Sequence, residues 1–425
     1  MLKPDRENKK LNKLELLAPA GDMEKMKIAI AYGADAVYFG GTEFSLRAGA
    51  GGLTVDEIRE GVAYAHERGV RCHMTLNIYA HNEDLEPLKE YLAQLEGIPI
   101  DAFIVSDPAV ILLIKDRFPE AELHLSTQAN TTNYLSAAFW HQIGVKRLVL
   151  ARELSLEEIR QIRENIPAEL ELEAFAHGAM CISYSGRCLL SNFMTGRDAN
   201  RGACAHPCRY KYRLEEEKRP GEYWPVEEDD RGTYIFNSND LCMLPYIPQL
   251  AEAGICSLKI EGRMKSIFYI AHVIGAYRQA IDQWEKMADQ PLHDSDQWYD
   301  PAWLQEMMKA SHRNFTTGFY FGQPTAEDQN YESSSYSREY AFVGLVKDYD
   351  PERKIALVEQ RNKMVVGEEI EVFGPGNPGF SQRISQMLDE EGTPIESAPH
   401  PQQMVQIPME HPVGENWMLR RQNQE

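Results

Sequence analysis

The sequence predicts an α/β protein: a (β/α)8 barrel of the TIM type, followed by a small antiparallel β-barrel domain. Two observations predict the first part. Short apolar runs alternate eight times with amphipathic helical patterns, and these units fill about 280 residues, the size typical of this fold. A third observation predicts the second part, because from Glu339 onward the pattern changes to short strands and turns. An open doubly wound sheet is the alternative, but eight evenly spaced units favour the closed barrel.

The predicted elements follow one another with short connections. The eight strands are expected at residues 14–20, 36–41, 72–78, 102–107, 122–128, 147–153, 171–178 and 256–262. The helices that follow them are expected at residues 23–33, 54–69, 83–97, 108–118, 133–144, 155–165, 244–254 and 266–287. Asp22 has the position of an N-cap for the first helix. We therefore expect domains at 1–337, including a cysteine-rich insertion at about 178–243 and a connector, and at 338–425.

Composition limits the classes of protein to consider. The net charge of −21 argues against a nucleic-acid-binding surface over the whole molecule. Positive charge is instead concentrated between Arg187 and Arg213, which hold six basic residues against one acid, so this local patch is the part of the chain suited to a nucleic acid. No apolar run reaches 18 residues, and the charged N-terminus lacks the apolar stretch of a secretory signal. We expect a cytoplasmic protein that does not cross a membrane.

Five of the seven cysteines lie in the single loop that follows the seventh strand: Cys181, Cys188, Cys204, Cys208 and Cys242. In a barrel this loop lies at the C-terminal ends of the strands, where active sites of the fold are found. Cys72 and Cys256 begin strands at the opposite face and are expected to be small buried residues. The irregular spacing favours an iron–sulfur cluster over a structural zinc site, which prefers closely paired cysteines. A single thiol nucleophile would not explain five cysteines.

Alternation within the strands predicts a polar barrel interior. The side chains expected to face inward are His73, Thr75 and Asn77; Glu122, His124, Ser126 and Gln128; Glu173, Phe175 and His177; and Ser257, Lys259 and Glu261. Barrel interiors are normally apolar, so a polar one indicates either a substrate pocket or a self-satisfied network such as Lys259 with Glu173.

Several stretches resemble one known family. ELEAFAHGAMCISYSGRCLLS (171–191), ELLAPAGD (15–22), ADAVYFGG (34–41), LKIEGR (258–263) and NFTTGFYFG (314–322) are similar to the signatures of the collagenase-like peptidase family of unassigned catalytic type, number 32 of the U series. The likeness covers nearly the whole chain. Despite its name, this family includes oxygen-independent hydroxylases of tRNA wobble uridine, ribosomal RNA cytidine or the ubiquinone ring. The length and the extra β-domain resemble the tRNA-modifying branch.

The resemblance implies a [4Fe-4S] cluster and prephenate as hydroxyl donor, with 5-hydroxyuridine in tRNA as the product. It places the cluster ligands at Cys181, Cys188, Cys204 and Cys242, with Cys208 as a surplus thiol. We expect the donor to be held by polar groups at the barrel mouth, namely Asn77, Gln128, His177, Lys259 and Glu261. Arg47, Arg152 and Arg263 are expected to bind its carboxylates.

Alternatives remain open at this point. A peptidase, as the family name suggests, is one, and a zinc-stabilised binding module without chemistry is another. A hydroxylase acting on ribosomal RNA or on the ubiquinone ring is a third. A shorter member of the family or a second copy of the chain is a further expected partner.

Overall fold

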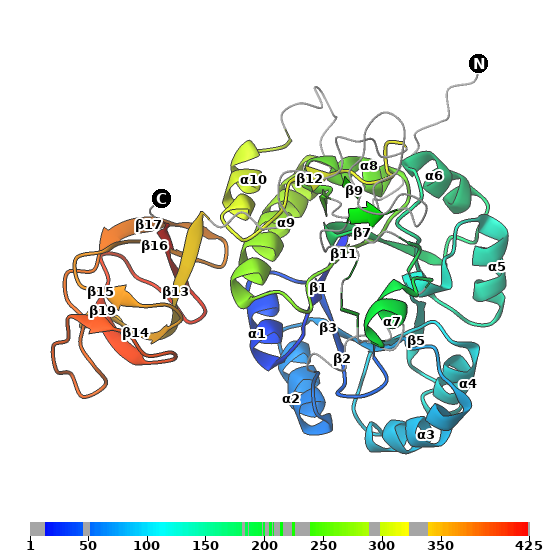
Figure 1. Cartoon of the computed structure of the whole chain (residues 1–425), viewed down its shortest axis with the longest axis horizontal. Coiled ribbons are helices and arrows are strands. Elements are labelled where there is room, and N and C mark those ends of the chain that lie inside the picture. The colour runs from blue at the N-terminus through cyan, green and yellow to red at the C-terminus, as the bar shows by residue number, and fades with distance from the viewer. Residues whose placement is uncertain are drawn as a thin grey trace.

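The computed structural model describes residues 13–45, 52–180, 183–185, 187–197, 199, 204–205, 207, 213–215, 223–225, 239–288, 298–322 and 339–423. Two structural units follow one another along the chain (Figure 1). A ring of helices surrounds the strands of the first unit, and a smaller β unit lies beside it. The predicted boundary between the domains, at residues 337 and 338, lies outside the described residues.

The first unit is a closed barrel of eight parallel strands, as the sequence predicts. Each strand pairs with the next along the chain, and β11 closes the barrel by pairing with both β7 and β1. The strands are β1 Glu15–Pro19, β2 Ala36–Gly40, β3 Arg71–Leu76, β4 Ala102–Val105, β5 Glu122–Leu125, β6 Arg147–Val149, β7 Glu171–Ala179 and β11 Ser257–Ile260.

Helices cover the outside of the barrel. They are α1 Met23–Ala31, α2 Val55–His66, α3 Leu85–Gln94, α4 Pro108–Arg117, α5 Tyr134–Gln142, α6 Leu156–Glu164, α8 Ile247–Glu252 and α9 Ile267–Ala288. Short polar caps fix where they begin. Asp22 accepts a hydrogen bond from the Lys25 backbone, as predicted, and Thr54 with Glu57 forms a capping box at α2. Their apolar faces form one continuous core with the outer faces of the strands.

The barrel strands are extended at one end by additional strands. β10 Asp240–Cys242 pairs antiparallel with the last residues of β7, and β12 Phe315–Thr316 pairs with β10. Between β7 and β10 the chain forms α7 Leu190–Thr195 and a hairpin of β8 Arg213–Glu215 and β9 Tyr223–Pro225. Short 3-10 turns occur at Asn82–Asp84, Thr127–Ala129 and Leu244–Tyr246, and α10 Pro301–Met308 packs on α9.

The second unit is an antiparallel sheet with its own core. Six strands are ordered β17-β16-β20-β13-β14-β19, and β15 pairs with β18. They are β13 Tyr340–Asp350, β14 Ile355–Gln360, β15 Met364–Val365, β16 Glu369–Gly374, β17 Asn377–Arg383, β18 Ser397–Ala398, β19 Met404–Pro408 and β20 Met418–Gln422. The two edge strands are linked by a side chain: Gln382 of β17 donates to the Pro408 carbonyl and accepts from the Glu410 backbone. The predicted β-barrel is therefore a six-stranded sheet bridged between its edges by Gln382.

The two units dock through a buried polar centre within an aromatic contact. Arg420 of β20 is 1% exposed and pairs with Glu306 of α10 and with Glu371, and it lies 2.7 Å from His272 of α9. Phe268 of α9 stacks on Phe342 of β13 with ring centroids 5.3 Å apart. The smaller unit is thus held against the side of the barrel by charge pairing and by apolar packing.

Candidate active site at the barrel mouth

Polar side chains follow β3 and β5 at the C-terminal end of the barrel. The Asn77 amide donates to the Ser126 hydroxyl at 3.4 Å, and that hydroxyl donates to the Gln128 amide oxygen at 3.3 Å. Gln128 is buried, and its amide nitrogen has no partner among the described residues. A buried amide without a partner is costly unless a ligand or water satisfies it. Asn77 and Gln128, predicted from separate strands, therefore come together in one site.

Arg152 and Glu261 lie at the mouth after strands β6 and β11. The Arg152 guanidinium lies 4.1 Å from the centroid of the Phe175 ring and donates to the Ala179 carbonyl at 2.5 Å. Its closest approach to the Glu261 carboxylate is 4.0 Å. Arg152 follows β6 and Glu261 follows β11, so the barrel places these opposite charges side by side at its C-terminal end.

Arg263 reaches across the mouth from the end of β11. It is 5% exposed and donates to the Thr75 hydroxyl at 3.2 Å and to the Ser45 hydroxyl at 3.4 Å. Gly40 makes this path possible, because a Cβ atom there would lie 2.4 Å from an Arg263 nitrogen. The third predicted arginine, Arg47, lies outside the described residues.

Lys259 lies deeper in the barrel and is already paired. Its ammonium is 2.8 Å from Glu173 and 4.4 Å from the centre of the Tyr38 ring. Glu173 also accepts from Arg147 at 3.3 Å, and Arg147 pairs with Glu15. For this pair, the structure confirms the self-satisfied network that the sequence offered as the alternative to a pocket.

Two neutral histidines complete the polar interior. The rings of His73 and His124 meet edge to face at 4.7 Å, and both side chains are fully buried. Burial lowers the pKa of each well below its usual value, as do the neighbouring cations, so both are uncharged near neutral pH. The predicted polar interior is therefore present.

His177 does not face the barrel interior, and that expectation was wrong. Its ring lies against Tyr269 and Tyr277 of α9 and Phe315 of β12, with centroid separations of 5.6 to 5.9 Å. The cause is a β-bulge, because Lys259 pairs with Phe175 whereas the next residue, Ile260, pairs with His177. One extra residue reverses the side to which all following side chains point. Burial lowers the pKa of His177 to about 3.

Three cysteines of the loop lie among the described residues, and one of them, Cys242, is on a strand. Cys242 lies on β10 directly opposite His177, and Cys188 and Cys204 are half-buried. Burial raises the pKa of the Cys242 thiol to about 12. Cys181 and Cys208 lie outside the described residues. Ser191 of α7 accepts a hydrogen bond from the Ala205 backbone, which brings the chain beside Cys204 back to α7.

The sequence missed one cluster of possible metal ligands, formed by His66, Cys72 and Asp101. In the part of the chain that the structure describes, it is the set of three such side chains whose ligand atoms all lie within 4.8 Å. It lies at the opposite end of the barrel, where Asp101 accepts from the Cys72 backbone and contacts His66 at 2.8 Å. His66 and Cys72 are 6 residues apart and Cys72 and Asp101 are 29 residues apart, so the sequence gives little sign that the three meet. Cys72 is buried as predicted, whereas Cys256 is only half-buried.

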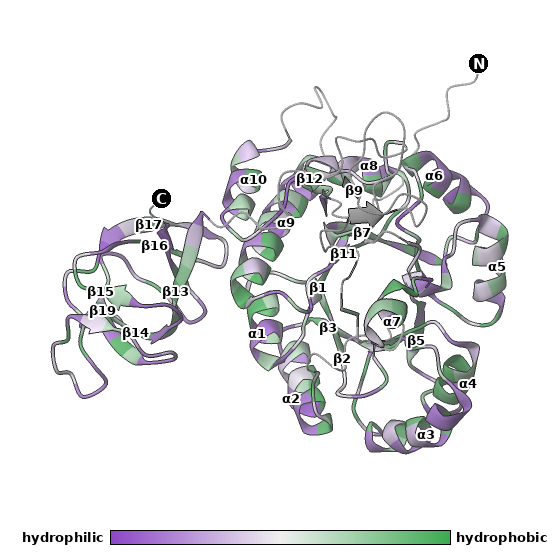
Figure 2. Ribbon diagram, viewed as in Figure 1, coloured by the Kyte–Doolittle hydropathy of each residue, from purple (hydrophilic) through white to green (hydrophobic). Residues whose placement is uncertain are grey.

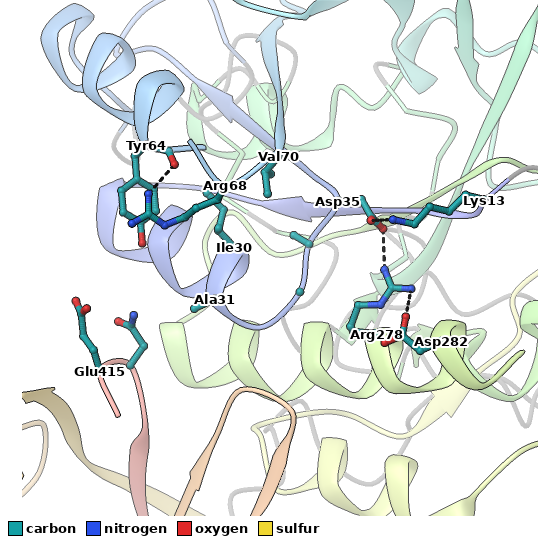
Figure 3. Close-up of a pocket in the computed structure, with 13 residues that line it drawn as sticks. Lys13, Ile30, Ala31, Asp35, Tyr64, Arg68, Val70, Arg278, Asp282 and Glu415 are labelled. Atoms are coloured by element: carbon teal, nitrogen blue, oxygen red, sulfur yellow. Dashed lines mark hydrogen bonds and ion pairs between the residues drawn. The ribbon is translucent and has the colours of Figure 1, made fainter. Parts of the chain in front are cut away.

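A pocket of about 590 Å³ lies away from the mouth, between α1, α2, α9 and the turn at Glu415 (Figure 3). Its cations are already engaged: Arg278 pairs with Asp35 and Asp282, and Lys13 pairs with Asp35. Arg68 lies flat on the Tyr64 ring at 3.6 Å. The charged side chains named here therefore pair mainly with one another.

Family models match both units of the chain. Residues 21–330 match peptidase family U32, and residues 338–420 match the peptidase family U32 C-terminal domain. The chain belongs to peptidase family U32. In this U32 protein, none of the described helices has the length and apolar character needed to cross a membrane.

Three curated relatives of this U32 chain have different names. It is 41% identical to tRNA hydroxylation protein P1 of Bacillus subtilis, over 96% of this chain and 95% of that one. It is 38% identical to the 23S rRNA 5-hydroxycytidine C2501 synthase of Escherichia coli, over 64% of this chain and 40% of that one. It is 30% identical to a collagenase of Porphyromonas gingivalis, over 97% and 98% of the two chains.

Proposed function

We propose that this U32 protein is an RNA hydroxylase that forms 5-hydroxyuridine at the wobble position of tRNA. The observation that carries the proposal is the similarity to the Bacillus subtilis tRNA hydroxylation protein, which extends over nearly all of both chains. A second relative, which is named for 5-hydroxycytidine formation in ribosomal RNA, supports the same class of reaction on another base.

The second part of the proposal is a [4Fe-4S] cluster held by Cys181, Cys188, Cys204 and Cys242. The donor chemistry fits, because the three that the structure describes are cysteine side chains on the loop that leaves β7 and returns at β10. Ligands of one cluster bind different irons and are therefore spaced more widely than ligands of a single ion. When bound, such a cluster would supply one-electron transfer next to the mouth. Cys208 remains the surplus thiol in this proposal.

The chain's own residues would bind and orient an oxygen-rich donor, for which prephenate is our proposal. Arg152 and Arg263 present guanidinium groups at opposite parts of the mouth, suited to two carboxylates. The unsatisfied amide of Gln128, with Asn77 beside it, offers hydrogen bonds to hydroxyl or carbonyl oxygens. Lys259 and Glu261 set the charge beneath and beside this space. His177 has no such role, because it faces α9 and supports the strand that carries Cys242.

The proposal is tested by deleting the gene in its host, restoring single variants and measuring 5-hydroxyuridine in purified tRNA by mass spectrometry. Cys188→Ala, Cys204→Ala and Cys242→Ala should each abolish the modification and reduce the iron and sulfide content of anaerobically purified protein. Cys256→Ala, outside the loop, is the matched control and should retain both. Unchanged 5-hydroxyuridine in the deletion strain would refute the proposed substrate, and wild-type protein that holds zinc instead of iron would refute the cluster.

Two further measurements separate the remaining proposals. Blocking the cell's synthesis of prephenate should remove 5-hydroxyuridine, and supplying prephenate should restore it. The similarity to the Porphyromonas gingivalis collagenase favours peptide hydrolysis as the second candidate. Peptide cleavage by metal-free wild-type protein, together with unchanged tRNA and ribosomal RNA nucleosides in the deletion strain, would favour that alternative.

A further inference from the structure

An exposed apolar patch lies in the cysteine loop, next to the barrel mouth. Eleven large apolar side chains are exposed among the described residues, and four of them lie within residues 184–194: Tyr184, Leu189, Phe193 and Met194. We call these four side chains the mouth patch. Phe193 on α7 is 89% exposed, the highest value of the eleven. Figure 2 shows α7 as largely hydrophobic, and in this view the helix lies inside the ring of outer helices.

The patch is tied to the proposed active site. Asn130, which follows Gln128, donates to the Ser185 carbonyl at 3.0 Å, next to Tyr184 in the chain. The Tyr79 hydroxyl, in turn, donates to the backbone carbonyl of Gln128 at 3.0 Å. The chain at Tyr184 and Ser185 therefore lies beside the segment that carries Gln128.

Positive charge flanks the apolar side chains. Arg187 and Arg197 are both exposed, one on each side of α7 in the sequence. The stretch from Arg187 to Arg213 holds six basic residues against one acid, in a chain whose net charge is −21. An aromatic surface bordered by arginines suits an unpaired nucleotide, because the base stacks on the ring and the phosphates pair with guanidinium groups.

Resting on the proposed function, we propose that Phe193 is a stacking platform for an unpaired base of the tRNA anticodon loop, with Arg187 and Arg197 binding the neighbouring phosphates. Phe193 is in this sense a positioning residue: it holds the loop while the adjacent base enters the mouth. Stacking tolerates every base, so the platform sets position and contributes little to the choice of base.

The test measures binding of the full-length wild-type protein and variants to a fluorescent anticodon stem–loop RNA. Phe193→Ala should weaken binding by about 5-fold to 100-fold, whereas Phe193→Tyr should retain it. Phe139→Ala is the matched control, because Phe139 of α5 is also exposed, at 54%, and lies outside the loop. Arg187→Ala and Arg197→Ala should each lower the slope of log affinity against log salt by about 0.7. The iron content should remain that of the wild type in all variants.

The outcomes distinguish this inference from the function on which it rests. If wild-type protein forms 5-hydroxyuridine but Phe193→Ala binds the RNA and modifies tRNA equally well, the platform is refuted and the hydroxylase is not. If the deletion strain keeps 5-hydroxyuridine while Phe193→Ala loses affinity, the proposed reaction fails and the RNA surface stands. A change in oligomeric state with unchanged RNA affinity would identify the patch as a subunit interface and overturn the inference.

Discussion

At the scale of single residues, burial controls which groups can carry charge. His177, His272, His73 and His124 are each buried, and burial keeps their pKa values below the ordinary value of about 6.5. Neutral imidazoles of this kind pack against their neighbours or form hydrogen bonds, as His272 does with Arg420, but carry no charge to bind an anion. The charged groups near the surface of the mouth, Arg152 and Glu261, are therefore better placed to act on a polar ligand.

His177 gives a prediction about acid stability. Its pKa is about 3 in the folded protein and about 6.5 in the unfolded chain, so the unfolded chain binds the proton first as the pH falls. Stability contributed by neutral His177 is therefore present above pH 6.5 and is lost progressively below it, by about 3 kcal/mol at pH 4. Replacement by phenylalanine, which suits the surrounding aromatic rings, should remove this loss.

The measurement is the free energy of unfolding by urea at pH 7, 5 and 4, for wild-type and His177→Phe protein. The advantage of the variant should grow as the pH falls. Parallel curves for the two proteins would show that His177 does not titrate differently in the folded state.

At the scale of elements, β7 carries the irregularity that shapes the site. After the bulge, Gly178 has a φ of +111°, a conformation that L side chains rarely adopt. A Cβ atom there would lie 2.7 Å from the Glu261 carbonyl oxygen. β7 and the segment after β11 therefore approach each other closely only because residue 178 is glycine.

Gly178→Ala should destabilise the protein and displace Glu261. The backbone strain costs about 1 kcal/mol or more, and the contact with Glu261 adds to it. Gly69→Ala is the matched control, because Gly69 also has a positive φ, of +71°, but has no neighbour within 4 Å of an added Cβ. Thermal unfolding should show a larger loss for Gly178→Ala, accompanied by loss of tRNA modification. Equal losses in the two variants would show that the contact with Glu261 contributes nothing.

The elements also show how far the sequence was informative. Periodicity predicted all eight strands of the barrel and the helices between them, because each unit buries one apolar face. It predicted the convergence of Asn77 and Gln128, since both follow parallel strands. Alternation failed at His177, because a bulge adds one residue without any signal in the hydrophobic pattern. The cluster of His66, Cys72 and Asp101 was missed because three separate segments contribute one residue each.

At the scale of the whole molecule, the docking of the two units depends on Arg420. Its guanidinium is buried between Glu306, which belongs to the barrel unit, and Glu371 of the smaller unit. The arginine holds the pKa of both carboxyl groups below the usual value, against the effect of their own burial. Both carboxylates depend on this one cation, and Lys309 assists.

Arg420→Ala should loosen the smaller unit and cost about 1.5–3 kcal/mol, because the half-buried carboxylates of Glu306 and Glu371 lose the charged hydrogen-bond donor that they share. Arg421→Ala is the matched control, because Arg421 is more exposed and pairs with Glu368 within its own unit. Calorimetry should show one unfolding transition for wild type and the control, and two for Arg420→Ala. A single transition of unchanged midpoint would contradict the role of Arg420 in docking.

The pairing of β10 with β7 has a thermodynamic consequence. The chain leaves the barrel after Ala179 and returns directly opposite it at Asp240, so the two ends of the cysteine loop are already joined by the sheet. The entropic cost of closing the loop grows only slowly with its length. Folding of the barrel offsets this cost, so a group that binds within the loop does not have to offset it. The sheet therefore holds both ends of the cysteine loop, and the length and residues of this loop can change between related chains while the barrel beneath it stays the same.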